Sequence, residues 1–167
     1  MARRKQSNLG SEHFTKMVRT TMETTAWRSL STAAQSLYVW LKLEWHGSSF
    51  NNNGKIRLSV RQAAFKIGIS INTAARAFHE LQAKGFIVVT KHARLGIKGQ
   101  ATSPTFELTE LALPHGASTT GRRLYQEWKP DADYPVHKAA VHNPNGRQGK
   151  RNPVIKLVTS RHQNRDA

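Results

Sequence analysis

The sequence predicts an α+β fold that is mainly α-helical and carries a small antiparallel β-hairpin. Residues 59–85 read as two capped helices joined by a tight glycine turn, and residues 86–109 contain two strand-like runs separated by a basic loop. A length of 167 residues suffices for one domain with a modest core, and no internal repeat is visible. We expect that domain to span residues 11–128.

The first of the two helices begins at Ser59. Gln62 follows in the position that completes a capping box, in which the Ser hydroxyl accepts from a first-turn amide and the Gln side chain returns to the Ser amide. Gly68 can adopt the left-handed backbone that ends such a helix. The turn is therefore very short, because Ser70 already caps the next helix.

The second helix has one apolar and one polar face. Ala74, Ala77, Phe78 and Leu81 recur at i, i+3, i+4 and i+7, which predicts a buried stripe, and Gly85 ends the helix. At about 100° per residue, the opposite face carries Asn72, Arg76, His79 and Ala83, with Thr73 and Glu80 on its flank.

The polar face of the second helix suits DNA. An Arg fork can bond guanine O6 and N7, an Asn amide can bond adenine, and a hydroxyl near a helix N-terminus suits phosphate. An ordinary solvated helix face is the alternative; the short glycine turn and the surrounding charge favour DNA. The candidate DNA-binding residues are Ser59, Arg61, Ser70, Asn72, Thr73, Arg76, His79, Lys91, Arg94 and Lys98.

Three short runs predict strands. Residues 86–90 form a short run rich in β-branched side chains, residues 105–109 alternate outward polar with inward apolar side chains, and residues 55–58 follow a turn signal at 51–54. The loop 91–100 between the first two is basic and glycine-containing. Helix, strand, helix, helix, strand, loop, strand is the order of a winged helix-turn-helix domain.

Residues 30–47 predict a scaffold helix that packs over this motif. Ser31 is its expected cap, and its expected buried stripe is Ala34, Leu37, Tyr38, Leu41 and Trp45. Trp40 and Leu43 fall off the stripe, and either cover the N-terminal segment or form a dimer contact. A preceding short helix is expected to contain Met17, Val18, Met22 and Trp27, while Leu124, Tyr125 and Trp128 share a face that can dock back on the domain.

Positive charge gathers on the motif. The chain has 26 Lys and Arg against 10 Asp and Glu, a formal net charge of +16. Residues 55–100 hold nine basic residues and one acid, Glu80, whereas residues 11–54 are nearly balanced with four against three. A phosphate-binding face on the helix pair and hairpin would need positive charge in these residues. A ribosomal or nucleoid coating protein would explain the charge but not the capped helices and hairpin.

The two ends differ from the middle. Residues 1–10 are expected to form a basic flexible arm, because they lack the apolar core of a signal peptide. Residues 129–167 are expected to form a basic, largely disordered tail. Its apolar segment 154–158 is either without a role or a docking strand for a protein partner.

Catalysis has little support in the sequence, so an enzyme is not expected. The closely spaced carboxylates Asp131 and Asp133 lie in a proline-flanked loop, and the eight His residues lack a zinc spacing. The three Tyr residues would need a metal-binding His cluster to act in a DNA-nicking enzyme. No cofactor motif is apparent, no stretch approaches a membrane span, and the absence of Cys agrees with a cytoplasmic location.

Residues 27–108 resemble the winged helix-turn-helix DNA-binding proteins of bacterial plasmids, phages and integrative elements. This family includes regulators and replication-initiator-like proteins, among them rhizobial conjugative-transfer repressors. The resemblance covers about half the chain. It rests on residues 26–31, 52–56, 58–59, 63–64, 67–70, 73–77, 81 and 85–87. The resemblance implies this fold and double-stranded DNA as partner, but does not separate regulators from initiators.

The sequence thus predicts a sequence-specific double-stranded DNA-binding protein, most simply a transcriptional regulator of a bacterial mobile element. A replication or recombination accessory protein that binds repeats at an origin is the alternative, and a non-specific nucleic-acid coating protein is the third. A homodimer and a partner for the C-terminal tail stay open.

Overall fold

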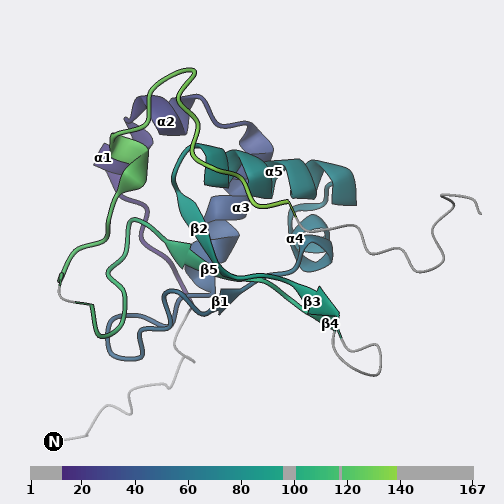
Figure 1. Cartoon of the computed structure of the whole chain (residues 1–167), viewed down its shortest axis with the longest axis horizontal. Helices are drawn as coiled ribbons and strands as arrows, with labels where there is room; N and C mark the ends of the chain where they lie inside the picture. The colour runs from purple at the N-terminus through teal and green to yellow at the C-terminus, as the bar shows by residue number, and fades with distance from the viewer. Residues whose placement is uncertain (1–12, 96–100, 117, 139–167) are drawn as a thin grey trace, which may run out of the picture.

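The chain folds into an α+β structure, described by a computed structural model for residues 13–95, 101–116 and 118–138 (Figure 1). The helices are α1 (Arg19–Met22), α2 (Thr25–Arg28), α3 (Thr32–Leu43), α4 (Val60–Ile67), α5 (Ile71–Ala83) and the 3-10 helix η2 (Leu124–Gln126). The strands are β1 (Ile56–Arg57), β2 (Ile87–Lys91), β3 (Arg94–Leu95), β4 (Ala101–Thr102) and β5 (Thr105–Leu108). The α+β class predicted from the sequence is confirmed.

A small antiparallel sheet lies beside the helices. Its strand order is β1-β5-β2, and Phe106 of β5 pairs with Ile56 on one side and Val89 on the other. The register shifts between Val89 and Lys91, beyond which β3 and β4 pair separately. A bulge increases local twist and bends the strand. The β3–β4 part of the hairpin therefore projects away from the sheet (Figure 1).

The predicted helix caps are present. Ser59 and Gln62 form a complete capping box at the start of α4, and Gly68 ends that helix with φ 77° in the left-handed region. The side chains of Ser70 and Ser31 accept from Thr73 N and Ala34 N at the starts of α5 and α3. Each cap satisfies an amide that has no partner within its helix.

Aromatic rings join the helices to the sheet in one core. Phe86 lies edge-on to Trp27 and Tyr38, with ring centroids 5.7 and 5.3 Å away, and stacks on Tyr125 at 4.8 Å. Edge-to-face and stacked pairs stabilise beyond the area they bury. Tyr125 is 2 % exposed, so the predicted docking of the segment around η2 is confirmed for this residue.

The N-terminal helices are shorter than the sequence predicted. Ala34, Leu37, Tyr38 and Leu41 form the buried face of α3 as expected, but α3 ends at Leu43 and Trp45 lies beyond it, half-buried. The single preceding helix is in fact two four-residue helices, α1 and α2, the second capped by Thr24. Trp40 is half-buried and lies under Lys66 Nζ, 4.6 Å from the ring centroid.

The expected alternation of β5 is wrong. All four of its residues are buried, including the polar Thr105 and Glu107. Thr105 Oγ1 lies 2.8 Å from Thr90 Oγ1, and Arg122 donates to both carboxylate oxygens of Glu107 at 2.9 and 2.6 Å. The chain around Arg122 thus covers the face that the alternation placed in solvent, and the polar groups stay satisfied because partners cover them.

A buried polar cluster links α3 to Glu110, the second residue after β5. Glu110 accepts from Lys42 Nζ at 2.9 Å, from Tyr38 Oη at 2.6 Å and from Thr21 Oγ1 at 3.2 Å, and Thr21 Oγ1 also lies 3.2 Å from Tyr125 Oη. The side chains of Lys42 and Glu110 are 4 % and 7 % exposed. Burial, and then the Glu110 charge, raise the pKa of Tyr38 well above its ordinary value, so its phenol remains a hydrogen-bond donor.

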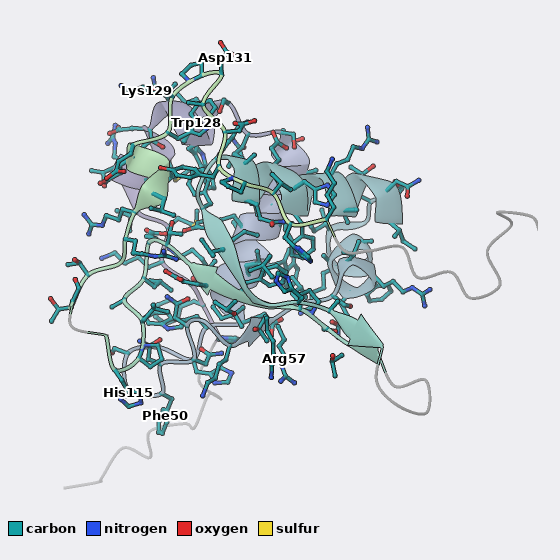
Figure 2. The ribbon with its side chains drawn as sticks, in the orientation of Figure 1. Phe50, Arg57, His115, Trp128, Lys129 and Asp131 are labelled. Carbon is teal, nitrogen blue, oxygen red and sulfur yellow. The ribbon has the colours of Figure 1, made fainter. Side chains whose placement is uncertain are left out.

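Residues 129–138, assigned to the tail from the sequence, return to α5. A turn at Lys129 and Asp131 reverses the chain (Figure 2), and Trp128 Nε1 donates to Asp133 across it at 2.9 Å. Tyr134 N then donates to Ala83 O at 2.8 Å. We call residues 134–138 the strap. The boundary expected at Trp128 therefore falls within a segment that packs on the domain.

In the part of the chain that the structure describes, no helix has the length and apolar character needed to cross a membrane. The same residues contain no group of three or more His, Asp or Glu placed to hold a metal ion. Asp131 and Asp133 are both exposed, and Asp133 accepts the indole hydrogen bond described above.

Candidate nucleic-acid interface

The exposed surface of α5 is concentrated in its N-terminal half. Asn72 and Arg76 are exposed and Thr73 is half-buried, while Ala74, Ala77, Phe78 and Leu81 on the other side are buried in the core. The polar face and the buried stripe predicted from the sequence are therefore both present here. Ile71, the first residue of α5, is 54 % exposed beside Asn72 and was not among the predicted site residues.

Two predicted hydroxyl contacts are already engaged within the protein. Ser59 Oγ donates to Gln62 Oε1 at 2.8 Å, and Ser70 Oγ accepts from Thr73 N at 3.1 Å and lies 2.8 Å from Thr73 Oγ1. Their first role is to cap α4 and α5. A hydroxyl has two acceptor lone pairs and one donor, so capping leaves it part of its capacity for a further contact.

The strap covers the C-terminal half of the same face. Ala83, which the sequence placed on the polar face, is only 8 % exposed. His137 N donates to Gln82 Oε1 at 2.9 Å, beside the bond from Tyr134 N to Ala83 O at 2.8 Å. Close approach is possible because the next turn has Gly85 at φ 75°, where an added Cβ would lie 2.8 Å from Tyr134 Cε2. The free part of the face therefore ends near His79.

His79 lies at the edge of the covered region. With Phe78, Val89, Phe106 and Lys138 it lines a cavity of about 340 Å³ between α5 and the hairpin. Burial, and then the charges of Lys138 and His137, lower the pKa of His79 below its ordinary value. At neutral pH it therefore offers a neutral imidazole, which suits hydrogen bonding better than attraction to phosphate.

Several basic residues on neighbouring elements are also exposed. Arg57 on β1, Arg61 on α4 and Lys91 at the end of β2 are exposed, and Figure 2 shows Arg57 projecting from the sheet. The backbone of Arg94 pairs with Thr102 in the β3–β4 hairpin, and Lys98 lies outside the described residues. The hairpin and the α4–α5 turn lie at the same end of the molecule, on the right of Figure 1.

The acid predicted on the flank of α5 is occupied elsewhere. Glu80 accepts from Ser31 N at 2.8 Å and from Ser31 Oγ at 2.6 Å, and so ties α5 to the start of α3. Its charge is therefore directed to the scaffold helix, and the exposed N-terminal half of α5 is left without a carboxylate of its own.

The comparisons with known proteins add nothing to this geometry. No family model, curated protein or solved structure matches the chain.

Proposed function

We propose that this protein is a sequence-specific double-stranded DNA-binding protein with a winged helix-turn-helix fold, acting as a transcriptional regulator of a bacterial mobile element. Its location would then be the cytoplasm, in association with the nucleoid. The observation that carries the proposal is the exposed N-terminal half of α5, which presents Asn72 and Arg76 beside a projecting hairpin.

The arrangement of elements supports this fold. A short first strand precedes a helix pair joined at a left-handed Gly68, and the next two strands return as a hairpin to give the order β1-β5-β2. The β3–β4 ribbon corresponds to the wing. In helix-turn-helix proteins the second helix of the pair enters the major groove with its N-terminal residues on base edges. These are the residues of α5 that the strap leaves uncovered.

The chemistry of the exposed residues supports a division of roles. Arg76 suits guanine and Asn72 suits adenine, since each can form a bidentate pair, and the side chain of Ile71 suits a thymine methyl group. Arg57, Arg61 and Lys91 suit the phosphates on either side, which position the protein without reading sequence. Arg94 and Lys98 of the wing are proposed to reach adjacent phosphates or the minor groove.

A selection experiment tests the proposal. Full-length protein is incubated with a random duplex library, and bound sequences are amplified over successive rounds. We expect one enriched motif whose affinity exceeds that for random duplex by about 10³-fold or more. Equal affinity for selected and random DNA would contradict sequence-specific binding.

Mapping of bound sites in the source genome separates the three classes of function. Sites over promoters support a regulator, and iterated sites at one origin support the alternative of a replication or recombination accessory protein. Uniform coverage supports non-specific coating.

Neutralising the wing should weaken binding to every sequence. Each phosphate contact releases counterions, so loss of two should reduce the slope of log K against log salt by about 2. Arg94→Gln with Lys98→Gln is compared with the wild type by fluorescence anisotropy at several salt concentrations. The matched control is Arg28→Gln with Lys129→Gln, which removes two exposed charges, one on α2 and one on the turn before the strap. An unchanged slope in the wing variant would show that Arg94 and Lys98 do not contact DNA phosphates.

Two truncations should distinguish the contribution of the strap from that of the residues that follow it. Removal of residues 139–167, which carry Arg147, Lys150, Arg151 and Lys156, should preserve the preferred sequence and lower affinity most at low salt, because such cations attract any polyanion. Removal of residues 129–167 should in addition lower the thermal unfolding midpoint, since the contacts of Tyr134 and His137 with α5 are lost.

Both truncations are assayed for unfolding temperature and for binding to selected and random duplex. If the shorter truncation binds random DNA as well as its site, recognition resides in residues 139–167 and not in α5. Equal unfolding temperatures for the two truncations would show that the strap contributes nothing to stability.

A further inference from the structure

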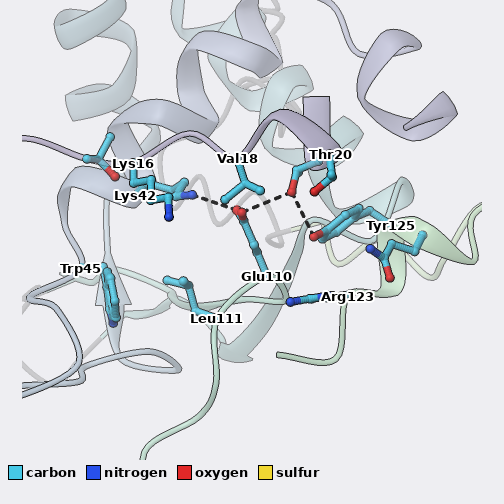
Figure 3. A pocket seen from close by; sticks show the side chains of 12 residues that line it. Lys16, Val18, Thr20, Lys42, Trp45, Glu110, Leu111, Arg123 and Tyr125 are labelled. Carbon is cyan, nitrogen blue, oxygen red and sulfur yellow. Dashed lines mark hydrogen bonds and ion pairs between the residues drawn. The ribbon is translucent and has the colours of Figure 1, made fainter. Parts of the chain in front are cut away.

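A second cavity lies on the opposite side of the molecule from the α4–α5 turn. It has a volume of about 280 Å³ and is lined by α1, α3, η2 and the residues after β5 (Figure 3). Lys16, Lys42, Glu110 and Arg123 supply its charged groups. None of these residues belongs to the proposed DNA interface.

Glu110, the one carboxylate among the described residues that line the cavity, is already engaged by hydrogen bonds and an ion pair within the protein. Glu110 accepts hydrogen bonds from Lys42, Tyr38 and Thr21, and Lys42 balances its charge at 2.9 Å. A carboxylate that already has three donors and a cation as partner has little capacity left for a cationic ligand. Glu110 therefore orients Lys42 and leaves the other two cations without a balancing charge.

Those two cations, Lys16 and Arg123, are both exposed, and neither is paired with a carboxylate in the described part of the chain. Within the described residues, the side chains of Lys16 and Arg123 take part in no hydrogen bond and no ion pair. In Figure 3 the side chain of Arg123 lies below that of Glu110. Lys42, 4 % exposed, uses one of its three N–H donors on Glu110. The cavity thus has a net positive charge and spare donors.

The backbone of Arg123 is also unusual. Its φ of 50° and ψ of 41° place it in the left-handed region, and its N–H donates to Thr109 O at 2.7 Å. This conformation costs free energy for any residue with a Cβ, and glycine would adopt it readily. Such outliers cluster at ligand sites, where a particular side chain is needed.

The walls around these donors are largely apolar. Val18, Leu111 and the ring of Trp45 line the cavity. An adjoining cavity of about 280 Å³ shares Trp45, Leu111 and Arg123 with it and extends toward Thr119 and Thr120. Ligand sites commonly combine apolar walls with a few convergent polar groups. The volume suits a ring or short chain that carries one acidic group.

We propose that this cavity binds a small organic anion, whose carboxylate or phosphate lies in the positive field of Lys16, Lys42 and Arg123 while its apolar part lies against Val18, Trp45 and Leu111. The site is separate from the proposed DNA interface, and its test requires no DNA.

Probes of matched shape test the site. The full chain labelled with ¹⁵N is titrated with benzoate, phenyl phosphate and benzamide, and the indole N–H signal of Trp45 is followed by NMR. We expect saturable shifts with benzoate or phenyl phosphate and at least about tenfold weaker binding of benzamide, because it fills the same space without the charge. The preferred anion distinguishes a carboxylate from a phosphate ligand.

Variants locate the binding. Lys16→Gln with Arg123→Gly should weaken binding of the anion by about tenfold or more, and Gly at position 123 suits the left-handed backbone, so the fold should be retained. Arg28→Gln, which removes an exposed charge outside the cavity, should bind as the wild type does. The proposal is overturned if neither anion gives a saturable shift, if benzamide binds equally well, or if the double variant binds as tightly as the wild type.

Discussion

Lys42→Met should lower the free energy of unfolding by about 3–5 kcal/mol, because it leaves the charge of Glu110 buried without its cation. Met has a similar length and fills the space of the Lys stem, so the loss reports the charge and not a cavity. Tyr38 and Thr21 still donate to the carboxylate, but neutral donors replace only part of the lost interaction. Urea denaturation followed by tryptophan fluorescence measures the change.

Two controls separate the buried charge from a general loss of packing. Lys42→Met combined with Glu110→Gln removes both charges and should recover at least half of the lost stability, since replacing both partners of a buried pair costs less than breaking it. Arg19→Met breaks the exposed pair of Arg19 with Glu23, whose side chains are 90 % and 50 % exposed, and should change stability little. If Lys42→Met behaves like Arg19→Met, the cluster around Glu110 is not a stabilising element.

The helix pair could be predicted from the sequence because its signals are local. Ser59, Gln62, Gly68 and Ser70 each act within one turn of the helix that they begin or end, so neighbouring residues were enough to identify α4 and α5. The apolar stripe of α5 is likewise a property of its own periodicity. These elements lie where the sequence placed them, within a residue or two.

The parts that the sequence missed depend on contacts between distant residues. Asn53 was taken only as part of a turn, yet it is 1 % exposed, accepts from Leu108 N at 2.7 Å and donates to Leu108 O at 3.0 Å. It therefore joins the turn before β1 to the end of β5. An Asn in a turn normally signals exposure, and only the folded partner reveals its burial.

The candidate site shows the same limit. The exposure of Asn72 and Arg76 follows from helical periodicity, but the burial of Ala83 does not, because it depends on the strap some fifty residues later in the chain. A segment containing Asp131, Asp133 and Pro135 has the composition of a tail. Its hydrogen bonds to α5 come from the backbone N–H groups of Tyr134 and His137, which almost any residue could supply. The glycine at position 85 is a local hint in the sequence that another segment can approach there, and the structure gives it a positive φ.

Arg76→Ala should weaken binding to the selected DNA site by about 1–3 kcal/mol, a loss of about five- to 150-fold in affinity, and should relax base preference at one position. Arg76 is exposed on the part of α5 that the strap leaves free, on the side away from the core. A bidentate contact with guanine would be lost, while phosphate contacts from Arg57 and Arg61 would persist. Fluorescence anisotropy on selected and random duplex, and a repeated selection with the variant, measure both effects.

The charge-matched control is Arg28→Ala, since Arg28 is also exposed but lies on α2. It should lower affinity for both duplexes slightly and by the same factor, through the long-range field alone. The difference between the affinity losses of the two variants on the selected site therefore measures the part of the Arg76 contribution to binding that depends on the DNA sequence. If Arg76→Ala weakens specific and random binding by the same factor and leaves the selected motif unchanged, Arg76 contacts only phosphate, and sequence recognition must come from Asn72 and Ile71 instead.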